Sequence, residues 1–254
     1  MAQLIRIFNS DLIKLKRTYI VLIHLCIVLV GIGLFLEYYN ISGYDSISKI
    51  VAYLQVIAIA FPLLSSIMCS MCVEQEYYSG NYKHILTASN PKYLTLISKY
   101  IILICLGFGA TLVSVIGFEF GIDTIFNDNH FTLSFYMISI LILAGSNLFE
   151  YILHLFLSLR FGKGASIGIG IVETLLSALL LTGLGDGIWQ YIPCAWGVRF
   201  VSVWASFSSS KESLSIKSIE KIQSIGLICS FVTILAFVIL CIWFSKWEGK
   251  KSEE

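Results

Sequence analysis

Six long apolar stretches constrain this chain more than any other feature of its sequence. Each approaches the ~20 residues that a helix needs to cross the hydrocarbon layer of a membrane. Of the 254 residues, 57% are hydrophobic and only 13% are charged, about half the charged share of a typical soluble domain. The sequence therefore predicts an all-α, polytopic membrane protein with six transmembrane helices. We place them at 19–36, 50–73, 100–118, 133–159, 166–184 and 222–244.

No soluble domain interrupts these spans, so residues 1–254 are treated as one transmembrane domain. The first seventeen residues mix apolar and basic side chains at helical spacing, unlike a cleaved signal peptide, which separates them. We predict an amphipathic helix over 1–17 that lies in the membrane interface. A frayed cytosolic tail is the alternative. The apolar face would carry Leu4, Phe8, Leu12 and Leu15, and the basic residues are Arg6, Lys14, Lys16 and Arg17.

Lysine and arginine indicate the orientation. With the N-terminus in the cytosol, inner segments hold twelve of the seventeen basic residues and outer segments hold five. Because basic residues favour the cytoplasmic side, both termini should be cytosolic. The net charge of +1 gives no reason to expect nucleic acid as a partner. Six of the seven cysteines lie in or beside apolar runs, so no disulfide framework is predicted.

A polar island, EQEYYSGNYKHILTASNPKYLTLISK, separates the second span from the third at 74–99. The pair Asn90-Pro91 should stop any helix there, because the residue before a proline is pushed out of the α region. We predict a short amphipathic helix that a soluble cytosolic partner can grip; an ordinary solvated loop is the alternative. The residues at helical spacing are Tyr78, Tyr82, Ile85 and Leu86.

The island resembles the E-x-E…G…K…L…P…K pattern of ABC-2 type transporter permeases. The matching residues here are Glu74, Glu76, Gly80, Lys83, Leu86, Pro91 and Lys99. In that family the segment is the coupling helix, which docks into a groove of the nucleotide-binding subunit. The resemblance implies that the chain is not an enzyme by itself, holds no catalytic residue or cofactor, and works with an ATPase, in two copies, that binds ATP and Mg²⁺. It assigns ATPase coupling to loop 74–92, where the candidates are Glu76, Gly80, Tyr82, Lys83, Ile85 and Leu86.

A narrower resemblance involves three further segments: LKRT at 15–18, LTGLGDGIW at 181–189 and IPCAWGVR at 192–199. Together they are similar to the lantibiotic-immunity permeases of Gram-positive producer bacteria, in particular the G-type subunit. That resemblance implies a bacterial cytoplasmic membrane, a second six-span permease subunit, an ATPase, and a lantibiotic peptide as cargo. The transporter would remove the producer's own peptide from its membrane lipid.

Two alternatives to this function stay open. The first is an ABC-2 exporter of another peptide, a drug or a lipid. The second belongs to a different class: a secondary transporter driven by protons through Glu150, His154 and Glu173. A gene for an ATPase beside this one would favour the ABC-type exporter.

Four ionisable residues lie inside the predicted spans. Burying an ionisable group in a membrane costs free energy, so such residues usually face a bundle interior or a cavity. At ~1.5 Å per residue they fall ~10–15 Å from the inner ends of their helices, so they could form one layer. Three interpretations compete: buried polar pairs that fix helix register, a contact or gate for a cationic peptide, and a metal site. We expect no metal, because too few ligands are visible and Cys69 and Cys72 should pack as small apolar residues. The four residues are His24, Glu150, His154 and Glu173.

The outer segment 185–221 is rich in aromatic residues, broken by Pro193 and Gly197. One interpretation is an aromatic belt at headgroup level. The other is a pair of short re-entrant helices that touch a membrane-bound peptide, with Asp186 and Arg199 satisfying their backbone. The candidate substrate residues here are Trp189, Trp196 and Arg199.

The segment FGKGAS at 161–166 has only a faint likeness to a phosphate-binding loop. It lacks the four-residue spacer between its glycines, and no strand precedes it. We expect instead that Gly164 and Gly168, four residues apart on one helical face, allow close packing between helices.

Overall fold

The computed structural model describes residues 2–16, 18–80, 82, 91–128, 130–209 and 216–249. Within these ranges there is no strand, and six helices are long and apolar enough to cross a membrane. The all-α, six-span prediction is therefore confirmed. The spans are α2 (Ile20–Ile41), α3 (Ser46–Tyr78), α5 (Lys92–Gly121), α6 (Leu133–Arg160), α7 (Lys163–Leu181) and α9 (Ile216–Ser245).

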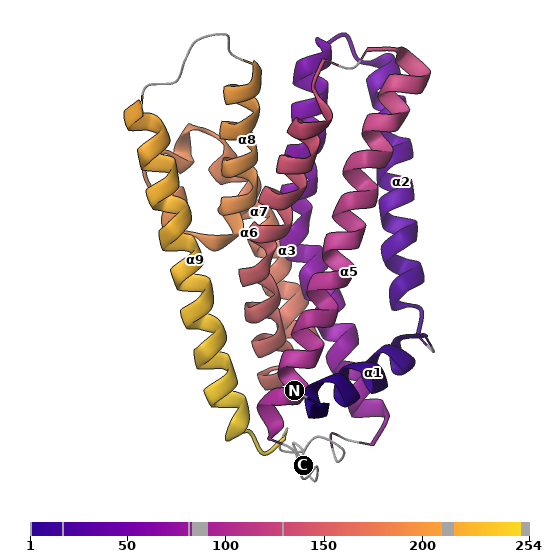
Figure 1. Cartoon of the computed structure of the whole chain (residues 1–254), viewed down its shortest axis with the longest axis vertical. Helices are drawn as coiled ribbons and strands as arrows, with labels where there is room; N and C mark the ends of the chain where they lie inside the picture. The colour runs from indigo at the N-terminus through magenta and orange to yellow at the C-terminus, as the bar shows by residue number, and fades with distance from the viewer. Residues whose placement is uncertain are drawn as a thin grey trace.

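The six spans run along the long axis of the molecule (Figure 1). In their most apolar windows, half of the residues of α3 and α6 are buried, but only 11% of those of α2 and 17% of those of α9. Helices α3 and α6 are thus the centre of the bundle. Small residues such as Ser66, Cys69 and Ser70 on the buried face of α3 let its neighbours approach closely.

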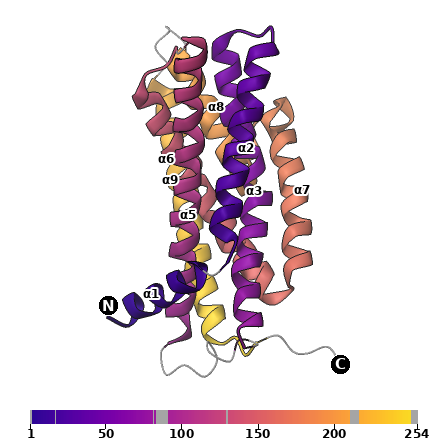
Figure 2. The ribbon, with the colours of Figure 1, turned by 90° about the vertical axis from the view of Figure 1, so that its right-hand side faces the viewer.

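Helix α1 (Ala2–Lys16) runs across one end of the bundle instead of along it (Figure 2). Its Leu15 is buried against the spans, so one face of α1 contacts the bundle, whereas Ile5 and Ile13 are exposed. Trp247 also packs at this end. We call the end that carries α1, Trp247 and the α3–α5 connection the inner end, and the opposite end the outer end. The position of α1 in a membrane interface stays a prediction.

Helix α7 packs on α3 where Pro62 interrupts the hydrogen-bonding pattern of α3. The backbone N–H of Leu63 donates to Thr174 Oγ1 at 3.3 Å. A Cβ added at Gly170 would lie 2.6 Å from Ser66 Oγ and 3.0 Å from the carbonyl oxygen of Pro62. Gly170 therefore permits the close approach. The expectation for Gly164 and Gly168 is wrong, since nothing lies within 4 Å of a Cβ at either position.

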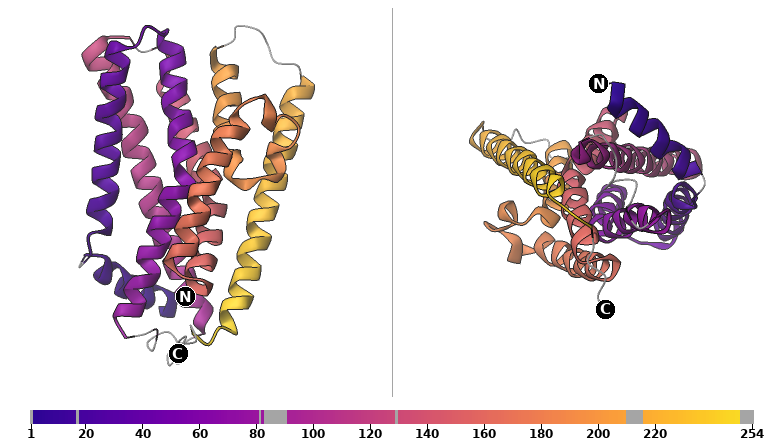
Figure 3. Two further views of the ribbon diagram at one scale, coloured as in Figure 1. Left: turned by 180° about the vertical axis from the view of Figure 1, so that it is seen from behind. Right: turned by 90° about the horizontal axis from the view of Figure 1, so that it is seen from below.

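After α7 the chain does not go directly to the outer end. It makes three single 3-10 turns, η2 (Gly183–Gly185), η3 (Trp189–Tyr191) and η4 (Pro193–Ala195). Helix α8 (Trp196–Ser209) then packs against α3 and α6. The turns lie below the outer ends of α8 and α9 (Figure 3, left). Two short re-entrant helices were one of the two interpretations of 185–221; the described part of this segment before α9 holds turns and one fourteen-residue helix that packs against the bundle.

At the outer end, Asp128 joins the α2–α3 connection to the segment before α6. Helix α5 continues as a short π-helix, η1 (Ile122–Phe126), and Asn127 adopts a left-handed conformation with φ of 49°. The hydroxyls of Tyr39 and Ser46 both donate to Asp128 Oδ2. These hydrogen bonds hold the pKa of the Asp128 carboxyl below its usual value.

Candidate functional site

Glu76, near the end of α3, is almost completely buried, with 2% of its surface exposed. Lys14 of α1 and Lys99 of α5 each donate from Nζ to Glu76 Oε1, and both distances are 2.7 Å. A carboxylate that accepts two charge-assisted hydrogen bonds is held firmly in place. Glu76 therefore fastens three helices together at the inner end.

Asp11 of α1 completes this arrangement. The hydroxyl of Ser98 donates to Asp11 Oδ2 at 2.7 Å, and Lys14 Nζ and Lys99 Nζ lie 3.4 Å and 3.9 Å from Oδ1. We call Asp11, Lys14, Glu76 and Lys99 the inner charge cluster. Its two acids balance its two bases, so it can be buried without excess charge. One sequence signal could have pointed to Asp11, because it is an acidic residue in an otherwise basic amphipathic helix.

Two residues that were predicted to couple to an ATPase are instead buried by contacts with other parts of this chain. Glu76 belongs to the inner charge cluster. Tyr82 is buried against Trp247 and Tyr77, with ring centroids 5.1 Å and 5.7 Å away, and burial raises the pKa of its hydroxyl. Gly80 has a φ of 145°, which favours glycine at the turn that ends α3. Lys83, Ile85 and Leu86 lie outside the described residues, so the coupling helix stays a prediction.

The inner surface beside this cluster carries exposed side chains. Tyr78 is 79% exposed and Tyr77 is 46% exposed. Lys163 Nζ lies 3.1 Å from Glu74 Oε2 in an ion pair that is partly open to solvent. These residues, rather than Glu76 or Tyr82, offer surface to a partner.

Within the spans, α6 and α7 bring together three of the four ionisable residues that the sequence singled out. Glu150 is ten residues from the last residue of α6, and Glu173 ten residues from the first residue of α7. Both lie ~15 Å from the inner ends of their helices. His154 Nε2 is 3.1 Å from Glu173 Oε2 and 3.7 Å from Glu150 Oε2. We call these three residues the intramembrane triad.

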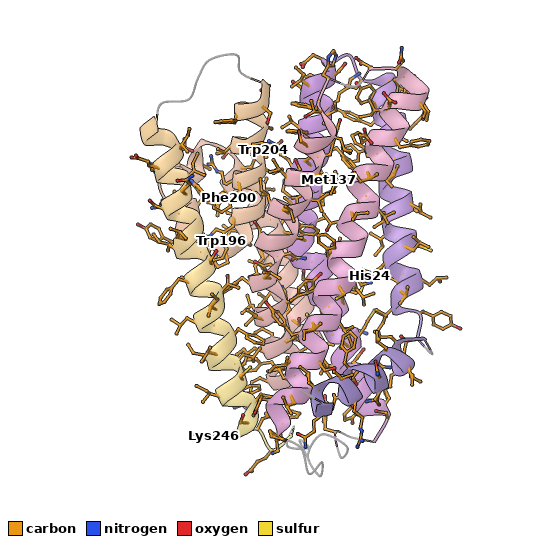
Figure 4. The ribbon with its side chains drawn as sticks, viewed as in Figure 1. His24, Met137, Trp196, Phe200, Trp204 and Lys246 are labelled. Atoms are coloured by element: carbon orange, nitrogen blue, oxygen red, sulfur yellow. The ribbon has the colours of Figure 1, made fainter. Side chains whose placement is uncertain are left out.

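The triad lacks the partners that the inner charge cluster has. Both oxygens of Glu150, Nε2 of His154 and Oε2 of Glu173 are buried without a hydrogen-bond partner among the described residues. On the other side of the ring, His154 Nδ1 lies 3.2 Å from Ser166 Oγ. His24 is not part of the group. It lies on α2 (Figure 4) and lines a separate small cavity with Ser65, Asn147 and Tyr151 among others.

Arg199 of α8 satisfies the carbonyl groups at the end of α7. Its Nε donates to the carbonyl oxygen of Leu180 and its Nη2 to that of Thr182, both at 2.6 Å. Nη2 also lies 3.0 Å from Asp186 Oδ1. The last carbonyls of a helix have no partner within it, so Arg199 lets the backbone turn inside the bundle. The expected role in satisfying this backbone agrees with these contacts for Arg199, whereas Asp186 is placed there through its ion pair with Arg199.

The aromatic residues of the outer segment mostly hold the segment itself. Trp196, Phe200 and Trp204 lie along α8 (Figure 4). Trp196 is buried, its Nε1–H donates to the carbonyl oxygen of Gln190 at 3.0 Å, and its ring meets Phe149. Trp189 packs edge-on against Phe200, with centroids 5.2 Å apart. Among the described residues, the large apolar side chains that remain exposed here are Leu184, Ile188, Tyr191 and, on α8, Phe207.

The comparison with known families adds an independent result. The family model of the ABC-2 family transporter proteins matches residues 7–179, which runs from α1 to near the end of α7. The chain belongs to the ABC-2 family. No curated protein and no solved structure matched it significantly. As an ABC-2 permease it is a multi-pass membrane component of a transporter, a class that is normally not catalytic itself and works with an ABC ATPase.

The match to the ABC-2 family includes both the inner charge cluster and the intramembrane triad. Asp11, Lys14, Glu76 and Lys99 all fall within residues 7–179, and so does the whole triad. The turns η2 to η4 and helix α8 follow the matched region. The ABC-2 match therefore covers both groups of charged residues, but it does not indicate the cargo.

Proposed function

We propose that this ABC-2 permease is the membrane-spanning subunit of an ABC exporter that removes a lantibiotic from the membrane of its bacterial producer. The ABC-2 match supports the exporter class. The cargo is supported by the resemblance of 15–18, 181–189 and 192–199 to lantibiotic-immunity permeases. In this arrangement ATP and Mg²⁺ bind in a separate ATPase, and a second six-span permease subunit sits opposite this one.

The observation that carries the coupling part of this proposal is the shared carboxylate of Glu76. The ATPase would grip the connection between α3 and α5 from the cytoplasm. Because Glu76 Oε1 accepts from both Lys14 and Lys99, a shift of the inner end of α3 pulls on α1 and α5 together. A local push by the ATPase thus moves three helices as a unit, which is the kind of rigid-body motion that alternating states require.

The outer segment is the proposed place of peptide contact. Leu184, Ile188 and Tyr191 form exposed apolar surface, and Asp186 lies among them with 72% of its side chain exposed. Lantibiotics of this class are amphipathic and cationic, so apolar surface with one carboxylate suits them. The peptide would be taken from the outer leaflet and released outward.

Resistance of a sensitive host tests the proposal. Cells that express this permease with its partner permease and ATPase should survive the cognate lantibiotic, and the ATPase should co-purify with the permease. We expect Tyr77→Ala combined with Tyr78→Ala to leave the protein inserted but to loosen the ATPase and reduce resistance. Loss of an interface anchor typically costs ~1–4 kcal/mol, which is enough to uncouple a modest contact.

The matched control changes Ser208 and Ser209 to Ala on α8, where each hydroxyl donates only to its own helix. This control should keep both resistance and the ATPase. If the Tyr77 and Tyr78 variant also keeps both, the surface beside α3 is not the docking element. Export of a different cargo would show as ATPase association without lantibiotic resistance.

A proton-driven transporter is the rival of a different class, and the intramembrane triad is the observation in its favour. Buried carboxylates and histidines form proton relays in pumps and transporters. In that case transport would collapse with the proton gradient and survive ATP depletion, and Glu150→Gln would abolish it. The ABC-type exporter predicts the reverse dependence on ATP.

A further inference from the structure

Five buried polar atoms between α6 and α7 have no hydrogen-bond partner in the part of the chain that the structure describes. Four belong to the intramembrane triad, and the fifth is Oγ of Ser177, one helical turn beyond Glu173 on α7. Native proteins leave few such atoms, and each one needs an explanation. Five of them on two neighbouring helices form a group of atoms that is suited to hold a ligand.

The contacts of Ser166 favour one of the two tautomers of His154. The Ser166 hydroxyl lies 3.5 Å from the main-chain oxygen of Ser66, to which it can donate its one proton. With the His154 proton on Nδ1, Ser166 Oγ also accepts from Nδ1–H at 3.2 Å, so both contacts of the hydroxyl are used. The other nitrogen, Nε2, is left with its lone pair pointing toward Glu150 and Glu173. In this tautomer three electron-pair donors converge on one place, and none of them has a hydrogen-bond partner in the part of the chain that the structure describes.

Contrary to the expectation from the sequence that no metal binds here, we propose that Glu150, His154 and Glu173 form a binding site for a divalent transition-metal ion of the Zn²⁺ kind. One ligand atom from each of the three residues lies within 4.8 Å of the other two. Neighbouring ligands of a tetrahedral zinc ion, with bonds of ~2.0–2.1 Å, are about 3.3 Å apart. The observed Nε2-to-oxygen distances of 3.1 Å and 3.7 Å lie on either side of that value.

Charge also favours a divalent ion. Two carboxylates and a neutral imidazole carry two negative charges, and no lysine or arginine among the described residues makes an ion pair with them. A divalent cation gives a neutral complex, which suits a site within the spans, where uncompensated charge is expensive. The hydrogen bond from Nδ1–H to Ser166 is the outer contact that metal-binding histidines usually make.

The ion would act as a structural clip. It would join α6 to α7 at the depth of Glu150, and η4 packs against both of these helices. Binding would therefore also stabilise the turns that precede α8. The fourth position is left to a water molecule or to the hydroxyl of Ser177.

Metal binding by the purified transporter tests this site. The full chain, isolated with its partner subunits, is stripped with a chelator and titrated with Zn²⁺, and bound metal is measured by mass spectrometry. We expect one zinc ion per chain. Glu150→Gln and Glu173→Gln each remove a ligand and should weaken binding more than ~100-fold, whereas Ser166→Ala, which removes an outer contact, should weaken it ~10–100-fold. His24→Ala and Glu74→Gln are controls and should bind as tightly as the wild type.

Thermal unfolding provides a second measurement that does not depend on transport. Zn²⁺ should raise the unfolding temperature of the wild type and of the His24→Ala control, but not that of Glu150→Gln. The glutamine variants keep side-chain size, so their unfolding without metal shows that they fold. The proposal is overturned if the wild type binds no Zn²⁺, in which case protons neutralise the triad. It is equally overturned if the glutamine variants bind Zn²⁺ as tightly as the wild type.

Discussion

The inner charge cluster and the intramembrane triad both bury two carboxylates, but the carboxylates of the two groups differ in the hydrogen-bond donors around them. In the cluster, Lys14 and Lys99 meet Glu76 at 2.7 Å and Ser98 donates to Asp11. In the triad, neither oxygen of Glu150 has a hydrogen-bond donor among the described residues. A satisfied cluster holds helices in place, whereas an unsatisfied one is a place for a ligand or a charge that moves. The comparison separates the part of the molecule that we propose to transmit motion from the part that we propose to bind an ion.

The largest expected effect follows from removing the carboxylate of Glu76. Glu76→Ala removes the 2.7 Å partner of buried Lys99 and leaves it only the Asp11 carboxylate at 3.9 Å, and breaking a buried ion pair in this way typically costs ~3–5 kcal/mol. We expect a clear fall in the unfolding temperature of the purified protein and in its abundance in the membrane. Glu74→Ala is the matched control two residues away. Its ion pair with Lys163 is partly exposed, so the change should cost less than ~1 kcal/mol. Equal effects of the two changes would remove the special role of Glu76.

The packing of α7 on α3 brings Glu173 to the triad, and the next effect in size concerns that contact. A methyl group at Gly170 would press on the main chain at Pro62, and overpacking a well-packed contact costs ~1–3 kcal/mol. Gly170→Ala should therefore lower the unfolding temperature, whereas Gly168→Ala, where nothing lies within 4 Å, should not. If both variants unfold alike, this contact does not position Glu173.

A change in the triad should have a small effect of either sign on stability in metal-free protein. Glu150→Gln replaces a buried carboxylate that has no donor with a neutral amide, which costs less to bury. We expect the unfolding temperature of the chelator-treated protein to stay within a few degrees of the wild type or to rise. A fall as large as that of Glu76→Ala would mean that Glu150 is satisfied in the same manner as Glu76, and the comparison would fail.

Asp128 lies between these extremes, because it accepts from Tyr39 and Ser46 but is partly exposed. Its pKa is lower in the folded protein than in the unfolded chain. It therefore contributes stability above the unfolded pKa, and this contribution is lost as the pH falls through the folded pKa. Asp128→Asn should slightly reduce stability at neutral pH and make the loss between neutral and acidic pH less steep. An unchanged pH profile would show that solvent screening cancels the contribution.

The positions of the spans could be predicted from the sequence because apolar run length alone determines them. The meeting of Glu150, His154 and Glu173 was also within reach, since helical spacing and depth place them on facing helices. The inner charge cluster could not be predicted from the sequence, because the pairing of Lys14 and Asp11 with Glu76 depends on how α1 crosses the bundle. Likewise, spacing suggested Gly164 and Gly168. The close contact is made by Gly170 instead, because Gly170 faces α3 at Pro62 and Ser66. Which carbonyl groups Arg199 would meet could not be predicted, because this depends on where α7 ends.

Transport by the reconstituted complex tests the account most directly. The permease, its partner permease and the ATPase are placed in vesicles that carry a fluorescent lantibiotic in their membrane, and loss of peptide from the membrane is followed on adding ATP and Mg²⁺. The account predicts release that requires ATP hydrolysis, is unaffected by a proton ionophore and is reduced by the Tyr77 and Tyr78 double alanine variant. Release that proceeds without ATP and stops with the ionophore would contradict it.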